Sequence, residues 1–483
     1  MPTPQMTMSR RQFLAATALT GLASACGSAP ATDPAAFRSE VRVPPLLEPT
    51  RGKDGTLAFA LTMRRGRSEL LPGGPVETWG FNGAYLGPTI RAARGDKVRM
   101  TVTNRLAEAS TVHWHGMRLP ARMDGGPHQP IEPGATWSPH WTVDQPATTS
   151  WYHPHPHGAT ARHVYRGLAG MFIVDDGPAE LPSRYGVDDI PLILQDKVLD
   201  AAPDPLKGTF GILGDHMLVN GTYRGFAHVR TERVRFRVLN GSNARRYHLT
   251  FADGRTFHVV GGDAGLLAAP VEVDRVSLSP GERVEVVVAF TGGEQVLLRT
   301  VSGSDDIDEG DFDLLRIVAA PRLAGSPPLP GRLTGAPAPI VVPSGARVRR
   351  FRLNGHDAIN GKEMDMSRID EVVPAGAVEI WEIENTVYAH NFHIHEVAFQ
   401  VLDVDGTEPE AWAGGHKDTV YVPPKSTVRL AVRFGEFTDP GTPYMYHCHI
   451  LRHEDSGMMG QFVIVKPGTE DRVPRTIPVQ HHM

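Results

Sequence analysis

The sequence predicts an all-β protein built from three β-sandwich domains. At 483 residues the chain is too long for one compact core, and chains of this length divide into about three domains of roughly 150 residues. The 50 glycines and 41 prolines indicate many turns and short connections, which is typical of architectures rich in β-strands. A weak internal repeat of alternating strands supports the same number of domains.

Each copy of this repeat begins with an alternating strand that ends in asparagine. We expect these strands at 97–104, 233–240 and 377–385, and a second strand led by proline follows each of them. The copies start at domain-sized intervals, and turn residues close the strands, as in β-sandwiches. The sequence therefore predicts three domains, which span residues 40–178, 179–330 and 331–483.

The first 30 residues have the features of a twin-arginine (Tat) export signal. Arg10 and Arg11 precede an apolar stretch that ends in small residues at 23–25. This stretch is shorter than the ~20 apolar residues that a membrane-spanning helix needs. We therefore expect a signal peptide at 1–30 and a mature protein in the periplasm or at the cell surface. For Cys26 two alternatives stay open: a lipid-modified first residue that anchors the protein, or ordinary signal-peptidase cleavage beside it.

Charge and cysteine content limit the classes of partner. The formal net charge of -5 provides no basic footprint, so we expect no nucleic-acid partner. We expect small-molecule partners and a monomer. Cys448 has no partner for a disulfide within the mature domains, so this thiol needs another explanation.

Eight histidines form four His-x-His pairs. Because side chains alternate across a strand, both histidines of a pair project from one face and can reach one site. The pairs occupy equivalent places in the first and third domains, so we expect the eight imidazoles to converge where these domains meet, with the middle domain as a spacer. The pairs are His113/His115, His153/His155, His393/His395 and His447/His449.

A second group of candidate ligands includes Cys448, which points to the opposite face from its two neighbouring histidines. A thiolate with two histidines and a weak axial methionine forms a blue-copper electron-transfer site. His453 and Met458 downstream, with His390 upstream, complete such a set. A path of a few covalent bonds would then connect this copper to the histidine cluster.

These motifs resemble those of multicopper oxidases, in particular the three-domain bacterial laccases and cuprous oxidases. The resemblance spans the mature chain and rests on His-Trp-His-Gly at 113–116, Trp-Tyr-His-Pro-His at 151–155, His-x-x-His-x-His at 390–395 and His-Cys-His at 447–449. It implies three cupredoxin-like Greek-key β-sandwich domains and four copper ions. It assigns the type 1 copper to His390, Cys448, His453 and Met458. It assigns the type 2 copper to His113 and His393, and the type 3 pair to His115, His153, His155, His395, His447 and His449.

Oxygen reduction consumes protons, so a carboxylate near the cluster is required as a relay or charge partner. Asp124 and Glu454 occupy places where the family has such acids, and we expect them to be catalytic together with Cys448 and His453, which carry the electrons. We expect Asp418 to orient a ligand histidine.

The resemblance also implies an activity. Cuprous oxidases of the family hold Cu(I) with a methionine-rich insertion that this chain lacks. We therefore expect a laccase-like oxidoreductase that takes electrons from phenols or aromatic amines at the exposed edge of His453 and reduces dioxygen to water. Met364 and Met366 keep open an alternative, a periplasmic cuprous oxidase for copper tolerance with Cu(I) as donor. Another alternative is a copper-free cell-division scaffold, because exported relatives of this fold have lost their ligands and serve in division; the intact ligand set favours the oxidase.

Overall fold

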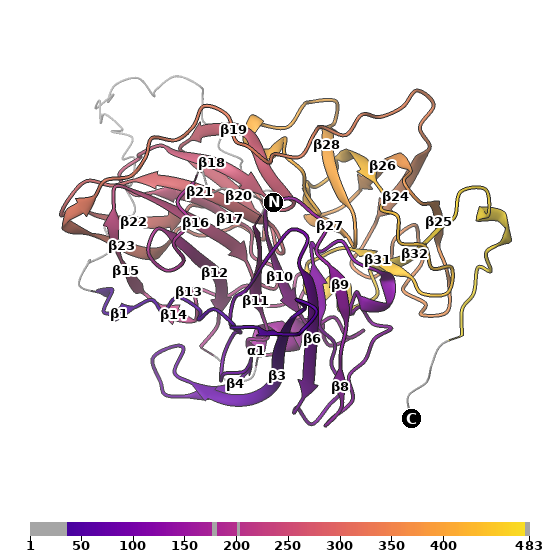
Figure 1. The fold of residues 1–483 in the computed structure, drawn as a ribbon, viewed down its shortest axis with the longest axis horizontal. Helices are drawn as coiled ribbons and strands as arrows, with labels where there is room; N and C mark the ends of the chain where they lie inside the picture. Colours follow the sequence, from indigo (N-terminus) through magenta and orange to yellow (C-terminus); the bar gives the residue numbers. More distant parts are fainter. Residues whose placement is uncertain (1–35, 176–180, 200–202, 479–483) are drawn as a thin grey trace, which may run out of the picture. The chain divides into compact units, whose positions relative to one another are not determined.

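The computed structural model describes residues 36–175, 181–199 and 203–478, and most of its regular structure is β-strand (Figure 1). The all-β expectation is confirmed. The expected signal peptide with Cys26 and the expected domain boundary at 178 lie outside the described residues. Among the residues described, no helix has the length and apolar character needed to cross a membrane.

The strands between residues 50 and 175 form the first pair of sheets. One sheet has the order β2 (Thr50–Arg51), β3 (Leu57–Ser68), β6 (Lys97–Asn104) and β8 (Thr136–Trp137), with β4 (Val76–Phe81) on β3 and β9 (His140–Thr142) on β6. The other has the order β5 (Ile90–Ala93), β11 (Gly170–Asp175), β10 (Thr148–His153) and β7 (His113–His115). Alternating apolar residues such as Phe59 and Met100 fill the core of this domain.

The middle of the chain forms the second pair of sheets. One has the order β14 (Thr222–Tyr223), β13 (His216–Val219), β12 (Asp189–Lys197), β16 (Arg233–Asn240), β21 (Arg283–Ala289), β18 (Phe257–Gly262) and β19 (Gly265–Val273). The other has the order β1 (Ser39–Glu40), β15 (Gly225–Thr231), β23 (Phe312–Ala324), β22 (Gln295–Thr300), β17 (Tyr247–Phe251) and β20 (Arg275–Leu278). The amino-terminal strand β1 therefore belongs to a middle sheet, where it pairs in parallel with β15.

The last third of the chain forms the third pair. One sheet has the order β24 (Val348–Leu353), β26 (Val378–Asn385), β30 (Thr427–Arg433) and β28 (Ala398–Val404). The other has the order β25 (Glu371–Pro374), β32 (Met459–Val465), β31 (Tyr444–His447), β27 (His390–Ile394) and β29 (Thr419–Val422). Its core includes Trp381, Phe392 and Cys448.

The three strand-ending asparagines make equivalent contacts, as expected of an internal repeat. They are Asn104, Asn240 and Asn385, at the ends of β6, β16 and β26. Each Oδ1 accepts a hydrogen bond from the backbone N–H two residues later, and each Nδ2 donates to backbone carbonyls nearby. The first two expected strands are confirmed, and the third begins at Val378.

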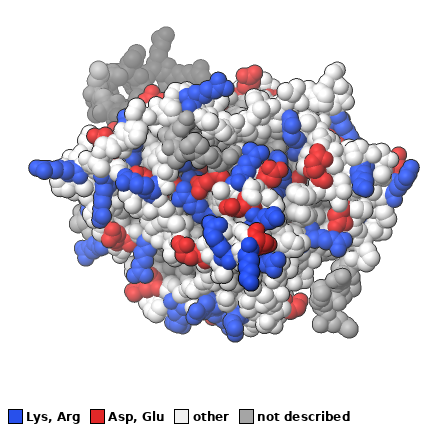
Figure 2. Space-filling model, viewed as in Figure 1, with Lys and Arg blue, Asp and Glu red and all other residues white. Residues whose placement is uncertain are grey.

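Short helices lie in the connections. They are α1 (Thr160–Arg166), α2 (Leu451–Asp455) and the 3-10 helices η2 (Ala121–Met123), η3 (Ala411–Ala413) and η4 (Glu470–Arg472). Asp455 joins the first two, because its carboxylate accepts hydrogen bonds of 2.8 Å from the backbone N–H groups of Thr160 and Ala161. On the face shown in Figure 2, basic and acidic side chains lie intermixed.

Candidate metal centre

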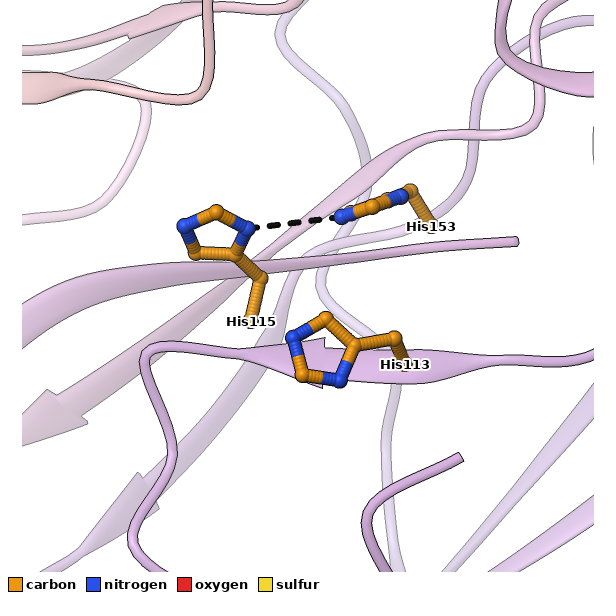
Figure 3. Close-up of side chains that lie close together, drawn as sticks. All are labelled: His113, His115 and His153. Atoms are coloured by element: carbon orange, nitrogen blue, oxygen red, sulfur yellow. Dashed lines mark hydrogen bonds between the residues drawn. The ribbon is translucent and has the colours of Figure 1, made fainter. Parts of the chain in front are cut away.

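The four His-x-His pairs lie at the ends of four strands. On neighbouring β7 and β10, His113 lies opposite His153, and Figure 3 shows these two rings with His115. On β27 and β31, His393 lies opposite His447. All eight imidazoles are buried.

The pairs of the first and third domains meet, as the sequence predicted. The ring of His113 stacks on that of His395, and the ring of His115 stacks on that of His393, with 3.8 Å between the centroids in both cases. Three groups of imidazoles have ring nitrogens within 4.8 Å of one another. They are His113/His115/His153, His113/His393/His395 and His155/His395/His447.

Hydrogen bonds at one nitrogen of a ring determine which nitrogen is free to bind a metal. Backbone carbonyls accept from four Nδ1 atoms at 2.8–3.2 Å, so the neutral form of each of these rings has its free lone pair on Nε2. They belong to His113, His153, His393 and His447. His395 follows the same rule, since its Nδ1 donates to Oδ2 of Asp124 at 2.8 Å. His115 is reversed: its Nε2 donates to Oδ1 of Asp418 at 3.0 Å, which leaves Nδ1 free.

As a result, unprotonated nitrogens face each other. Nε2 of His395 lies 3.3 Å from Nε2 of His447, and Nδ1 of His115 lies 3.4 Å from Nε2 of His153. Two lone pairs at this distance repel unless a cation lies between them. Burial lowers the pKa of His395, His115 and His153 well below its usual value, so a shared proton is a poor cation here. The imidazoles therefore fit a metal such as copper.

A second metal-binding group surrounds Cys448. Its Sγ lies 3.5 Å from Nδ1 of His390 and 3.4 Å from Nδ1 of His453. Met458 is buried beside it, and the Met458 carbonyl accepts a hydrogen bond from the Cys448 N–H at 3.1 Å. Burial raises the pKa of the Cys448 thiol to about 12, so ionisation needs a bound cation. A buried thiol with two imidazoles fits a blue-copper ion, and Met458, bound to Cys448 through its backbone, stays the candidate axial ligand.

The expected exposed edge of His453 is absent, and this expectation is wrong. His453 is buried, and its Nε2 donates a hydrogen bond to the Thr209 carbonyl at 3.0 Å. The Phe210 ring packs 5.8 Å from that of His453. Arg452 Nε holds the same segment by donating to the Gly208 carbonyl at 3.0 Å. A middle-domain loop thus covers the site where an aromatic donor would have to approach.

The two expected relay carboxylates both lie against the histidine cluster and are buried. The Asp124 carboxylate accepts a hydrogen bond from Nδ1 of His395. Glu454 has one oxygen 3.3 Å from Nδ1 of His155 and the other 3.2 Å from Nδ1 of His447. Although burial raises the pKa of Glu454, these two histidines hold it well below its ordinary value. The role of the two carboxylates, Asp124 and Glu454, in proton transfer stays a prediction.

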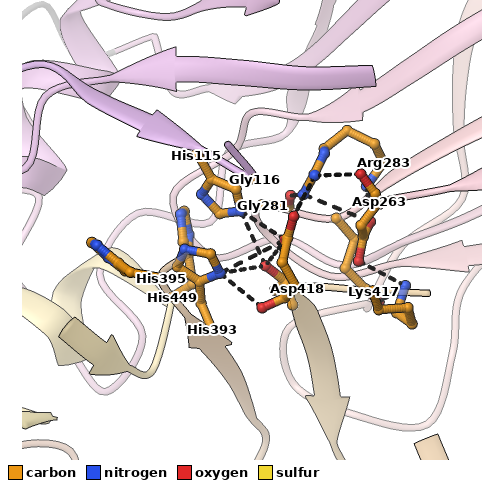
Figure 4. A network of polar contacts seen from close by, with 12 residues as sticks. His115, Gly116, Asp263, Gly281, Arg283, His393, His395, Lys417, Asp418 and His449 are labelled. Atoms are coloured by element: carbon orange, nitrogen blue, oxygen red, sulfur yellow. Dashed lines mark hydrogen bonds and ion pairs between the residues drawn. The ribbon is translucent and has the colours of Figure 1, made fainter. Parts of the chain in front are cut away.

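Sequence reasoning missed one residue of the site, Arg283. Asp418 orients His115, as expected, but the guanidinium of Arg283 on β21 holds the Asp418 carboxylate (Figure 4). The middle domain is therefore more than a spacer. A sequence signal was available in the Pro-Gly-Glu-Arg turn at 280–283, which matches the Pro-led strands of the other domains.

Comparison with known proteins identifies relatives over nearly the whole chain. Family models described as multicopper oxidase match residues 62–179, 194–304 and 337–468. Cell division protein FtsP of Escherichia coli (strain K12) is 37% identical over 95% of this chain and 99% of its own length. FtsP of Yersinia pestis is 39% identical over 96% of this chain and 100% of its own length.

Solved structures also resemble the chain. A laccase from Pediococcus acidilactici is 37% identical, with a TM-score of 0.81 over 89% of this chain and 95% of that protein. A laccase-like multicopper oxidase CueO from Ochrobactrum sp. is 37% identical, with a TM-score of 0.82 over 88% of this chain and 100% of that protein. The expected three-domain cupredoxin-like architecture is confirmed.

The expected laccase-like oxidation of phenols and aromatic amines is contradicted by the FtsP relatives, which match this chain almost from end to end under the name of cell division proteins. The alternative, a copper-free cell-division scaffold of the same fold, is better supported. The error has a physical cause: ligand motifs determine what a site can hold, whereas the rest of the surface determines what the protein contacts.

Proposed function

This chain belongs to the multicopper oxidase family, and on that premise we propose that it acts in cell division, outside the cytoplasm, as a scaffold of this fold. The observation that carries the proposal is the 37–39% identity to proteins named cell division protein FtsP, over 95–96% of this chain and 99–100% of theirs. Export by the twin-arginine leader at 1–30 would deliver the folded domains to that compartment.

The covered His453 supports a scaffold. An oxidase of organic donors needs an electron-entry ring within reach of its substrate, whereas here Thr209 and Phe210 lie over that ring. A scaffold acts through surfaces and needs no such opening.

Complementation tests this function. In the host bacterium, deletion of the gene should lengthen cells, and the full-length chain should restore normal length. A fluorescent fusion compatible with twin-arginine export should gather at the division site. If deletion leaves division unchanged and the fusion spreads evenly, the proposal is wrong.

A second candidate function is favoured by the facing imidazole nitrogens: the chain binds four copper ions and is an oxidoreductase with oxygen as acceptor. The Cys448 group would hold one copper and the eight imidazoles of the four pairs would hold three. Bound copper would supply one-electron redox chemistry coupled to oxygen reduction. The chain's own contribution would be fixed ring tautomers, with Asp124 and Glu454 as the candidate proton carriers.

One variant separates the two candidates. Cys448→Ser keeps the side-chain volume but removes the thiolate that a blue copper requires. It should restore division as well as the wild type does while losing blue absorption. A Cys448→Ser chain that is stable but fails in division would instead show that division depends on the redox centre. Elemental analysis of the wild type tests copper binding directly, and a metal-free protein after copper loading would exclude it.

A further inference from the structure

Arg283 lies next to the histidine cluster, although it comes from the domain that supplies no metal ligand. Its side chain is fully buried, and all five of its N–H donors have acceptors. Nη1 and Nη2 donate to the two carboxylate oxygens of Asp418, one at 2.7 Å and the other at 2.5 Å. This is the two-pronged pairing that a guanidinium makes and an ammonium cannot.

The remaining donors of Arg283 join the other domains. Nε donates to the Thr149 carbonyl of β10 in the first domain at 2.9 Å. Nη1 and Nη2 also donate to the carbonyls of Gly281 and Asp263 in the middle domain, at 3.0 and 2.7 Å. Figure 4 shows the pair of Arg283 with Asp418, which immediately precedes β29 of the third domain. With the Thr149 contact, one guanidinium therefore connects all three domains.

Asp418 in turn orients two candidate ligands, one from each side of the cluster. Its Oδ1 accepts from Nε2 of His115 at 3.0 Å, and its backbone carbonyl accepts from Nδ1 of His393 at 2.8 Å. The first bond leaves Nδ1 of His115 free to face His153. The position of the Asp418 carboxylate therefore decides which nitrogen of His115 is offered to a metal.

The guanidinium is closely packed, and the lysine beside it is already paired. Gly116 follows His115 with φ +81°, and a Cβ there would lie 2.6 Å from both Nη2 of Arg283 and Oδ2 of Asp418. The nearby cation, Lys417, is engaged with other carboxylates, 3.0 Å from Asp263 and 3.0 Å from Glu282.

We propose that Arg283 is a positioning residue of the metal cluster, because it fixes the Asp418 carboxylate that orients His115. The backbone carbonyl of the same residue orients His393. The role rests on the copper-binding candidate function and goes beyond the ligand set. It makes the middle domain a necessary part of the site that the first and third domains form.

Copper loading of full-length variants tests the role. Arg283→Met and Arg283→Lys should weaken copper binding at the cluster about 10- to 100-fold, the usual cost of losing a group that orients a ligand. The blue absorption of the Cys448 site should persist and serves as an internal reference for folding. The readouts are copper per chain, the type 2 paramagnetic resonance signal and the blue absorption.

Arg237→Met is the matched control. Arg237 is equally buried and contacts the same Thr149, through its Oγ1 at 2.9 Å, but it pairs with Asp189 and Glu285. This variant should lose stability while keeping cluster copper. The role is overturned if Arg283→Lys binds cluster copper like the wild type, or if Arg237→Met loses as much of it as Arg283→Met. If the wild-type protein binds no copper, the copper-binding function and the role of Arg283 both fail. If the wild type binds copper and only the variants behave differently from expectation, the role of Arg283 fails alone.

Discussion

The Nε2 atom of His453 donates a hydrogen bond to the Thr209 carbonyl across 244 residues of sequence, and this bond covers one side of the Cys448 group, the candidate blue-copper site. Phe210 completes the cover by packing on His453 and, at 5.3 Å, on Tyr388. The cover explains how a chain with a full set of candidate copper ligands can lack an open entry for an organic donor.

The cover predicts an unreactive thiol. In metal-free protein with Cys26→Ser, Cys448 should react with a thiol reagent only as fast as the protein unfolds, because it is fully buried. Phe210→Ala should speed labelling, since it removes an aromatic ring above His453, and should cost roughly 3 kcal/mol of folding free energy. Rapid labelling of the metal-free Cys26→Ser protein would show that the cover is open in solution.

Acid should weaken the contact between the first and middle domains at Glu285, whose Oε1 accepts a hydrogen bond from Oγ1 of Thr149 at 2.6 Å. Although burial raises its pKa, Arg235 and Arg237 lower it to about 2, against roughly 4.3 in an unfolded chain. Because the folded pKa is the lower one, the stabilisation is complete above about pH 5 and is lost as the pH falls through about 2. Glu285→Gln should therefore be much less stable than the wild type at pH 6, and the difference should shrink by about 3 kcal/mol toward pH 2. A difference in unfolding free energy that is independent of pH would contradict this.

The repeated asparagine should be structurally essential in each domain. Asn240→Asp keeps the Oδ1 acceptor for the Ser242 N–H but loses the Nδ2 donor to the carbonyls of Arg245 and Leu278. Two unsatisfied buried carbonyls cost about 1–3 kcal/mol each, so unfolding by denaturant should reveal a loss of that order. The exposed Asn82→Asp at a turn is the control, and it should cost less.

Copper should raise the unfolding temperature by relieving the repulsion between facing nitrogens. A ligand at about 1,000 times its Kd adds roughly 4 kcal/mol to the stability of the folded state. His447→Gln should remove most of this gain, since Nε2 of His447 lies within 3.1 Å of His155 and 3.3 Å of His395. Chelator treatment should return the wild type to its metal-free midpoint, and a midpoint that copper does not shift would argue against metal between these rings.

The sequence by itself determined what depends on local spacing. Alternation along a strand placed both members of each His-x-His pair on one side, and the same alternation turned Cys448 away from its neighbours. The asparagine repeat gave the strands β6, β16 and β26 and the number of domains. These features follow from backbone geometry within a few residues, which is why they could be predicted.

Tertiary structure decided what depends on contacts between distant segments. The carbonyl that covers His453 belongs to a loop with no distinctive local pattern, and Arg283 meets Asp418 across 135 residues at the junction of three domains. The Pro-Gly-Glu-Arg turn at 280–283 marks the position of Arg283 in the repeat, but not its partner. Neither contact can be predicted from local periodicity, because each exists only once the domains have packed together. Local spacing in the sequence therefore established which candidate metal ligands the chain carries. The packing of the domains established how these side chains are held and whether a substrate can reach them.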